Sequence, residues 1–130
     1  MKQKYEKELI RIAGKYNLNY LKQQFDNCFG GYWYVETFSL YNENGCFTIH
    51  YLGQRQELDF YVTPSISTKR EELANNRIDV TKYKADVWEK ELPNINIFSL
   101  SYASNFLILL TKVIEMQLEE SGSFFGIKVN

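Results

Sequence analysis

The stretch from residue 32 to residue 63 constrains the fold of this chain more than any other feature. It reads YWYVETFSLYNENGCFTIHYLGQRQELDFYVT. Apolar and polar side chains alternate through three runs, at about 32–41, 46–52 and 57–63, and such a period of two is typical of strands that are buried on one face. Because short connections separate the runs, the stretch predicts an antiparallel three-stranded meander.

The two connections also predict how the strands pair. A two-residue turn at 44–45, where Asn and Gly tolerate positive φ, would place Leu40 opposite Ile49. A second turn over 53–56 would place Ile49 opposite Phe60. Both pairings gather the same apolar side chains on one face, whereas a slip of one residue would send the apolar set of a whole strand to the other face.

Helices are expected on either side of the meander. Apolar residues recur at helical spacing and are followed by Gly or Pro stops, most clearly in the last helix, which begins near residue 101 and ends at Gly122. Phe125, Ile127 and Val129 then alternate with polar or small residues, which predicts a further C-terminal strand over about 124–129 that joins the sheet. The expected helices are 2–16, a short turn around 20–25, 69–76, 80–92 and 101–122.

These elements define the expected architecture. At 130 residues, the chain suits a single α+β domain, residues 1–130, in which the antiparallel meander packs with the N-terminal and C-terminal helices.

Composition and charge exclude several function classes. Fifteen basic and sixteen acidic residues give a net charge of −1, which leaves no overall electrostatic footprint for nucleic acid. The start of the chain is charged and amphipathic, and no apolar run approaches the ~18 residues of a membrane span, so we expect a cytoplasmic protein with no membrane contact. Cys28 and Cys46 are expected to be reduced thiols. With one His and no paired Cys spacing, no metal site or cofactor is expected.

One row of polar residues invites a catalytic interpretation. The predicted pairing sets Ser39, His50 and Asp59 side by side on the face opposite the apolar set, where Asp59 would favour the protonated form of His50. Acyl transfer also requires oxyanion donors and a sharply presented nucleophile, and Ser39 lies inside a strand whose amides are committed to pairing. A polar cross-strand ladder is therefore favoured, and we assign no catalytic residue and expect no enzyme.

The same face carries large side chains, which raises the question of what covers it. Either helices cover this face, or it forms an exposed platform of Trp and Tyr of the kind found at protein-binding hot spots. The sequence leaves both possibilities open. The residues concerned are Trp33, Val35, Tyr41 and Tyr61.

The chain as a whole resembles a class of bacterial proteins. The aromatic meander, the segment IDVTKYKADVW at 78–88 and the closing FFGI at 124–127 carry the resemblance. It is to the immunity proteins of contact-dependent inhibition and polymorphic toxin systems. The resemblance implies a cognate toxin domain as the partner, which the protein would bind and block at its active site or substrate entry without chemistry of its own. A net charge near zero departs from the acidity expected of an inhibitor that mimics nucleic acid.

On this interpretation, acidic and aromatic side chains form the contact surface. The acidic candidates are Glu71, Glu72, Asp79, Asp86 and Glu89, and the aromatic anchors are Trp33, Tyr41 and Tyr61.

Two other function classes stay open. A small-molecule-binding domain would use the concave apolar face with the helix 106–116 as a lid. A small hydrolase would use Ser39, His50 and Asp59. An exposed edge of the meander could also serve a homodimer.

Overall fold

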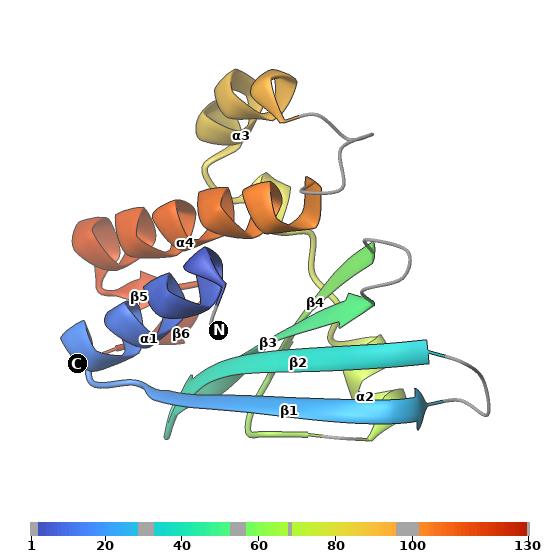
Figure 1. Cartoon of the computed structure of the whole chain (residues 1–130). Coiled ribbons are helices and arrows are strands. Elements are labelled where there is room, and N and C mark those ends of the chain that lie inside the picture. Colours follow the sequence, from blue (N-terminus) through green and yellow to red (C-terminus); the bar gives the residue numbers. More distant parts are fainter. Residues whose placement is uncertain (1–2, 29–32, 53–56, 68, 96–101, 130) are drawn as a thin grey trace.

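The computed structural model describes residues 3–28, 33–52, 57–67, 69–95 and 102–129, without the side chains of 25–28, 33–35, 70 and 94. The chain forms an α+β fold with one larger and one smaller antiparallel sheet (Figure 1). In order, the elements are α1 (Lys4–Lys15), β1 (Asn19–Cys28), β2 (Trp33–Asn42), β3 (Gly45–Leu52), β4 (Glu57–Thr63), α2 (Arg70–Asn75), the 3₁₀ turn η1 (Val80–Lys82), α3 (Ala85–Glu91), the 3₁₀ turn η2 (Leu92–Asn94), α4 (Tyr102–Ser121), β5 (Ser123–Phe124) and β6 (Ile127–Lys128).

The predicted meander is confirmed, and it has a fourth strand. The larger sheet has the order β1-β2-β3-β4. The helical turn predicted around 20–25 was wrong, because these residues lie in β1 and pair with β2. A six-residue helix is marginal alone, whereas the free edge of β2 offers backbone partners. Tyr20 and Lys22 of β1 both donate hydrogen bonds to the carboxylate of Glu6 in α1. The distances are 2.9 Å from the Tyr20 hydroxyl and 3.4 Å from the Lys22 ammonium group.

The predicted pairing of β3 with β4 is confirmed: Ile49 lies opposite Phe60. The pairing of β2 with β3 differs by two residues from the prediction.

A local hydrogen bond explains this difference. Leu40 lies opposite Phe47, and the turn occupies 43–44 instead of 44–45. The backbone N–H of Asn44 donates to the side-chain oxygen of Asn42 at 2.8 Å, an Asx turn that closes the hairpin one residue early. Because the register differs by two, every side chain stays on its predicted face.

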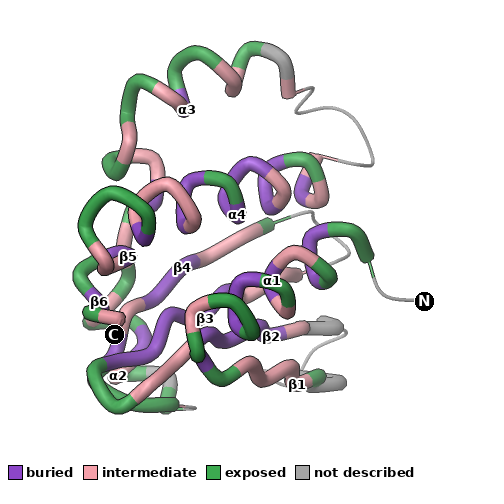
Figure 2. Tube along the Cα trace, turned by 90° about the vertical axis from the view of Figure 1, so that its left-hand side faces the viewer, coloured by how far each residue is buried: buried purple, intermediate pink, exposed green. Residues whose placement is uncertain are grey.

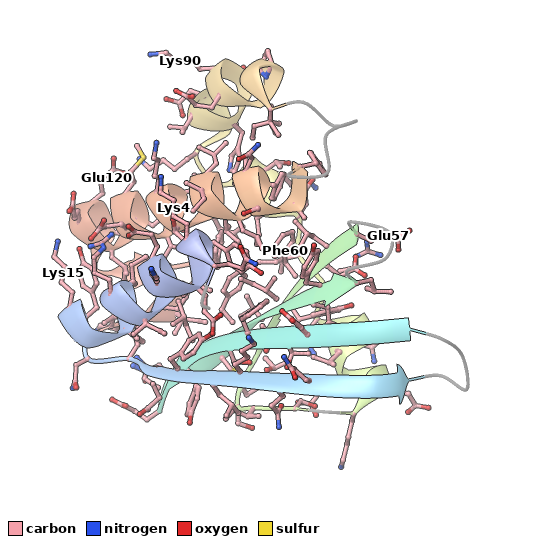
Figure 3. All side chains as sticks on the ribbon, in the orientation of Figure 1. Lys4, Lys15, Glu57, Phe60, Lys90 and Glu120 are labelled. Atoms are coloured by element: carbon pink, nitrogen blue, oxygen red, sulfur yellow. The ribbon has the colours of Figure 1, made fainter. Side chains whose placement is uncertain are left out.

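The main core lies between the sheet and two helices. Figure 2 shows α1 and α4 on one side of the larger sheet and α2 on the other. Figure 3 shows Phe60 between β4 and α4, while Lys15 and Glu120 point away from the core. Phe60 stacks on Phe106 of α4, with ring centroids 5.9 Å apart, and Phe106 stacks on Trp88 of α3 at 4.8 Å. Predicted helices at both ends of the chain are thus confirmed as α1 and α4.

The second face of the sheet is covered in large part. Helix α2, predicted over 69–76, lies on this side and contributes the buried Leu73. The question left open by the sequence is therefore answered in part: described residues of this face are buried, and α2 lies on their side of the sheet. The buried residues of this face are Thr37, Ser39, Cys46, Thr48, Tyr61 and Thr63.

The prediction that a C-terminal strand over about 124–129 joins the larger sheet was wrong. The chain makes a separate hairpin of β5 and β6 instead of joining the larger sheet. Phe125 and Gly126 have φ of +50° and +83°, as a two-residue hairpin turn requires, so the chain reverses there. The hairpin is tied to the β2–β3 turn, since Asn42 and Asn44 both donate side-chain hydrogen bonds to the carbonyl of Lys128, at 3.0 and 2.9 Å.

The helix predicted over 80–92 is divided in three. Lys84 adopts the left-handed conformation at φ +57°, which separates η1 from α3, and η2 follows α3 around Pro93. Asp79 caps the first turn: its side chain accepts a hydrogen bond from the Thr81 backbone N–H at 3.0 Å.

Helices α1 and α4 are joined by a cluster of charges. Two guanidinium nitrogens of Arg11 donate to the two carboxylate oxygens of Glu115 at 2.9 and 2.8 Å, and Lys15 donates at 3.2 Å. The hydrogen bond from Arg11 is the main reason why the pKa of Glu115 falls from 4.5 to about 2.

We predict that this cluster gives the fold an acid-dependent contribution to stability. A folded-state pKa below the unfolded value stabilises the fold above about pH 5, and this is lost as the pH falls toward 2. Urea unfolding of wild type and Glu115→Gln should differ by about 1 kcal/mol or less at pH 7, since Arg11 and Lys15 are solvated, and should converge near pH 2. A constant difference at all pH values would contradict the assignment.

Candidate functional site: a groove beside strand β4

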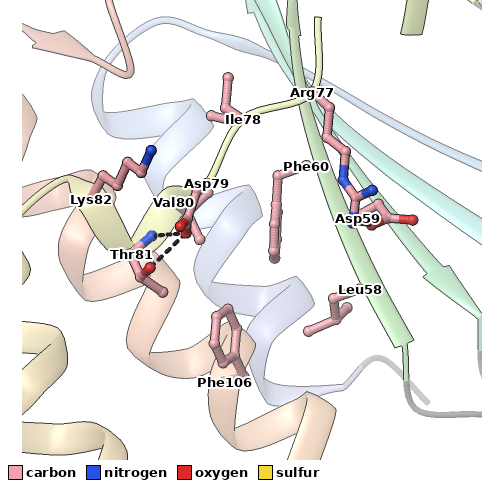
Figure 4. A pocket seen from close by; sticks show the side chains of 10 residues that line it. All are labelled: Leu58, Asp59, Phe60, Arg77, Ile78, Asp79, Val80, Thr81, Lys82 and Phe106. Atoms are coloured by element: carbon pink, nitrogen blue, oxygen red, sulfur yellow. Dashed lines mark hydrogen bonds and ion pairs between the residues drawn. The ribbon is translucent and has the colours of Figure 1, made fainter. Parts of the chain in front are cut away.

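An open groove lies along the outer side of β4, which is an edge strand of the larger sheet. The chain after α2 pairs with β4 over a short distance: the N–H of Val62 donates to the carbonyl of Asn76 at 3.0 Å, and that of Ile78 to the carbonyl of Phe60 at 2.9 Å. It then turns away into η1. The departure leaves a groove of about 540 Å³ between β4, η1 and α4 (Figure 4).

The floor of the groove is apolar. Phe60 and Phe106 are 7% and 8% exposed, and their stacked rings join the groove to the core. Val80 is buried beside them, because the Asp79 cap starts η1 at this point. Leu58 and Ile78, both half-buried, complete the floor.

Charged side chains of both signs form the rim. Arg77 forms an ion pair with Asp59, with 2.5 Å between Nη2 and Oδ1. Asp79 accepts hydrogen bonds from the hydroxyl and backbone N–H of Thr81, and these lower its pKa. Lys82 is exposed and makes no ion pair with any described residue, so it is the rim charge most available to a partner.

Apart from Lys82, the polar side chains of this groove are engaged with one another. Both carboxylates are engaged, one with an arginine and one as a cap, and the hydroxyl of Thr81 donates to a carboxylate that has a lowered pKa. A nucleophile next to a basic group of suitable pKa is the minimum for covalent catalysis. The described residues of this groove do not form such a pair, and an apolar floor inside a charged rim is the common form of a recognition surface.

The predicted row of Ser39, His50 and Asp59 was wrong in one of its two contacts. Ser39 lies opposite Thr48, with 3.2 Å between the hydroxyl oxygens, and His50 lies opposite Thr37. The two-residue change in register at the first turn causes this difference. Ser39 therefore has a threonine hydroxyl as its neighbour where the hydrolase hypothesis requires an imidazole.

The other contact, between His50 and Asp59, is confirmed, but its expected effect is not. Burial lowers the pKa of His50 and outweighs the nearby Asp59 carboxylate, which raises it. The prediction of a protonated His50 is corrected accordingly. Its ring contacts Tyr61 edge to face at 4.8 Å, so His50 is part of the packing on this face.

The predicted aromatic anchors do not gather at the groove. Tyr61 is 8% exposed, which leaves little of it for a partner, and Tyr41 is half-buried at the end of β2. Trp33 starts β2, and its side chain lies outside the described residues.

The acidic candidates are divided between separate parts of the molecule. Glu71 and Glu72 lie on α2, on one side of the larger sheet, and Glu72 accepts a hydrogen bond from Ser67 at 2.9 Å. Asp86 and Glu89 lie exposed on α3, on the other side (Figure 1). Of the predicted contact residues, only Asp79 lines the groove.

The sequence prediction did not bring the other residues of the groove together. Arg77, Lys82 and Phe106 come from three separate elements, and only the path of the chain after α2 brings them to β4. Phe106 was visible as part of an apolar helix face, although nothing in that pattern separates a groove floor from a core.

The described ranges contain neither a metal-ligand cluster nor a helix that could span a membrane. There, no three His, Cys, Asp or Glu side chains lie together as a metal site requires, and Cys46 is a buried free thiol. No helix within the described ranges has the length and apolarity needed to cross a bilayer.

Comparisons with protein-family models, with curated proteins and with solved structures found no match to this chain.

The state of His50 provides a direct check of this geometry. The chain has a single His, so an NMR titration of its imidazole protons is unambiguous. We expect a pKa below 6.5, and a further decrease in Asp59→Asn, because the substitution removes the charge that raises the pKa. A value above 6.5 in the wild type would instead support the protonated ladder.

Proposed function

We propose that this protein binds a toxin domain of another protein and blocks it, as immunity proteins do, and that the groove beside β4 is the centre of the contact. The observation that supports this proposal is the composition of the groove, in which an apolar floor lies inside a rim of two acidic and two basic residues. Protein interfaces commonly combine such a desolvated centre with a polar rim.

The size of a stable interface requires contacts beyond the groove. Each partner in a tight complex buries ~800 Å², or about a tenth of the 7824 Å² surface of this chain. From the groove, the contact would extend along η1 toward α3, where Asp86 and Glu89 are exposed. The acidic residues of α2 lie on the other side of the sheet and would not take part.

Binding and protection test this proposal together. The product of the neighbouring reading frame would be purified as the candidate toxin, and its affinity for this protein measured by calorimetry. We expect a stoichiometric complex, and growth rescue when both proteins are produced in the same cell. Absence of both would contradict the proposal.

Charge reversal at the rim tests the role of the groove. Lys82→Glu should weaken the complex by about tenfold, because a partner surface complementary to Lys82 would then face a like charge. Lys128→Glu is the matched control, since Lys128 is also exposed but lies on β6. Equal effects of the two substitutions would show that the groove is not the contact.

One observation favours a second candidate function, the binding of a small molecule. The groove volume of about 540 Å³ falls within the ~300–1,000 Å³ range of ligand sites, and Phe106, from the helix expected as a lid, forms part of its floor. A metabolite screen by thermal unfolding distinguishes the two functions. Stabilisation by a ligand that is lost in Phe106→Ala would favour this candidate, provided that the variant is folded by circular dichroism.

A further inference from the structure

The pairing of the larger sheet determines which backbone groups point away from it at β4. Asn42 and Gly45 close the two-residue β2–β3 hairpin and therefore exchange both backbone hydrogen bonds. Successive residues of a strand point their backbone N–H and C=O to opposite neighbours, so the even-numbered residues of β3 bond to β4. Their partners in β4 are the odd-numbered residues. The N–H and C=O of Leu58, Phe60 and Val62 therefore point to the outer edge. The bonds of Phe60 and Val62 to the segment 76–78 agree with this assignment.

The outer edge is paired over only part of its length. The N–H of Ile78 bonds to the carbonyl of Phe60, and the chain then leaves β4. Among the described residues, no backbone group of 76–82 bonds to Leu58. The backbone N–H and C=O of Leu58 therefore face the groove as a donor and an acceptor, spaced as in a strand. Leu58 lies beside the apolar floor of the groove (Figure 4).

The opposite edge of the sheet, β1, has features that prevent pairing. Lys22 points inward and contacts Glu6 at 3.4 Å, and the register is irregular between Asp26 and Cys28. An inward-pointing charge and a bulge are both devices that protect edges from added strands. The receptive edge is therefore that of β4.

We propose that an extended segment of a partner protein pairs with the outer edge of β4 at Leu58, inside the groove and beyond the part of the edge that the segment 76–78 covers. The inference rests on the proposed function and specifies how the partner is held. Only an extended backbone presents donors and acceptors that match such an edge.

The geometry also specifies the side chains of this segment. The residue opposite Leu58 shares its face of the sheet and contacts Phe60 and Phe106, so it is apolar. Its two neighbours point to the other face, beside the Asp59–Arg77 ion pair, and are polar or charged. The occupant is thus an apolar residue between two polar ones.

A second copy of this chain fits the edge less well. A two-fold dimer uses the same patch on both copies, and the segment 76–78 already covers Phe60 and Val62. Only the Leu58 end would be left for mutual pairing, whereas the proposed toxin contact adds the surface along η1 toward α3 to this short pairing.

A matched pair of variants isolates the backbone contribution. Leu58→Pro and Leu58→Ala both remove the leucine side chain, but only the proline removes the outward N–H, a change that edge strands tolerate. We expect Leu58→Pro to bind the toxin domain about tenfold more weakly than Leu58→Ala, since one backbone hydrogen bond is lost. Thermal unfolding verifies that both variants are folded. In the wild-type complex, the Leu58 amide should become protected from hydrogen exchange.

A peptide probe tests the edge without the toxin. The probe is acetyl-Lys-Thr-Val-Thr-Val-Thr-Lys-amide, and its control carries N-methyl groups on both valines. We expect millimolar binding with NMR shift changes at Leu58 and Phe60, and none with the control.

Peptide binding without toxin neutralisation would overturn the proposed function alone. A toxin complex with equal affinities of the two Leu58 variants and an unprotected Leu58 amide would overturn strand addition alone, as would peptide shifts confined to β1. If no toxin complex forms and the peptide does not bind, both proposals are overturned. Concentration-dependent dimerisation through Leu58 would show a second copy as the occupant.

Discussion

One column of stacked aromatic rings connects the elements of this fold. Phe47 of β3 stacks on Phe60 of β4 with ring planes 1° apart, and the column continues through Phe106 and Trp88. In the C-terminal hairpin, Phe124 contacts Phe47 edge to face at 6.1 Å, and the ring of Phe125 lies 4.7 Å from that of Phe47 at a tilt of 31°. Sheet, α3, α4 and hairpin therefore share one set of contacts, each adding about 0.5–1.5 kcal/mol beyond the burial of area.

The groove is a consequence of the same column. Phe60 and Phe106 have to meet for α4 to pack on the sheet, and their edges are left as an apolar floor where the chain after α2 departs from β4. The core and the candidate binding surface are thus continuous. Trp88 anchors the far end, and its indole N–H has no hydrogen-bond partner among the described residues, so packing outweighs one unsatisfied donor there.

The buried second face shows how polar residues are accommodated in this sheet. Ser39 and Thr48 bond to each other across the strands, and the Cys46 thiol lies 3.5 Å from the Thr48 hydroxyl. These polar groups have neighbours as partners, so they can be buried without a large desolvation cost. The arrangement explains how a face with many polar residues can be buried.

The amino-acid sequence by itself determined the period of the strands, the face on which each of their side chains lies, and the span of the long C-terminal helix. These features follow from local patterns of apolar residues, and the packing of the elements agrees with those patterns.

Tertiary structure decided the rest. Residues 20–25 have a weak pattern and became a strand because β2 offered an unpaired edge. The register at Leu40 depended on one Asn42 side-chain bond, and a shift of two leaves every face unchanged, so facing alone could not reveal it. The groove arose where residues far apart in sequence meet at β4, and that meeting depends on packing between elements that no local pattern records.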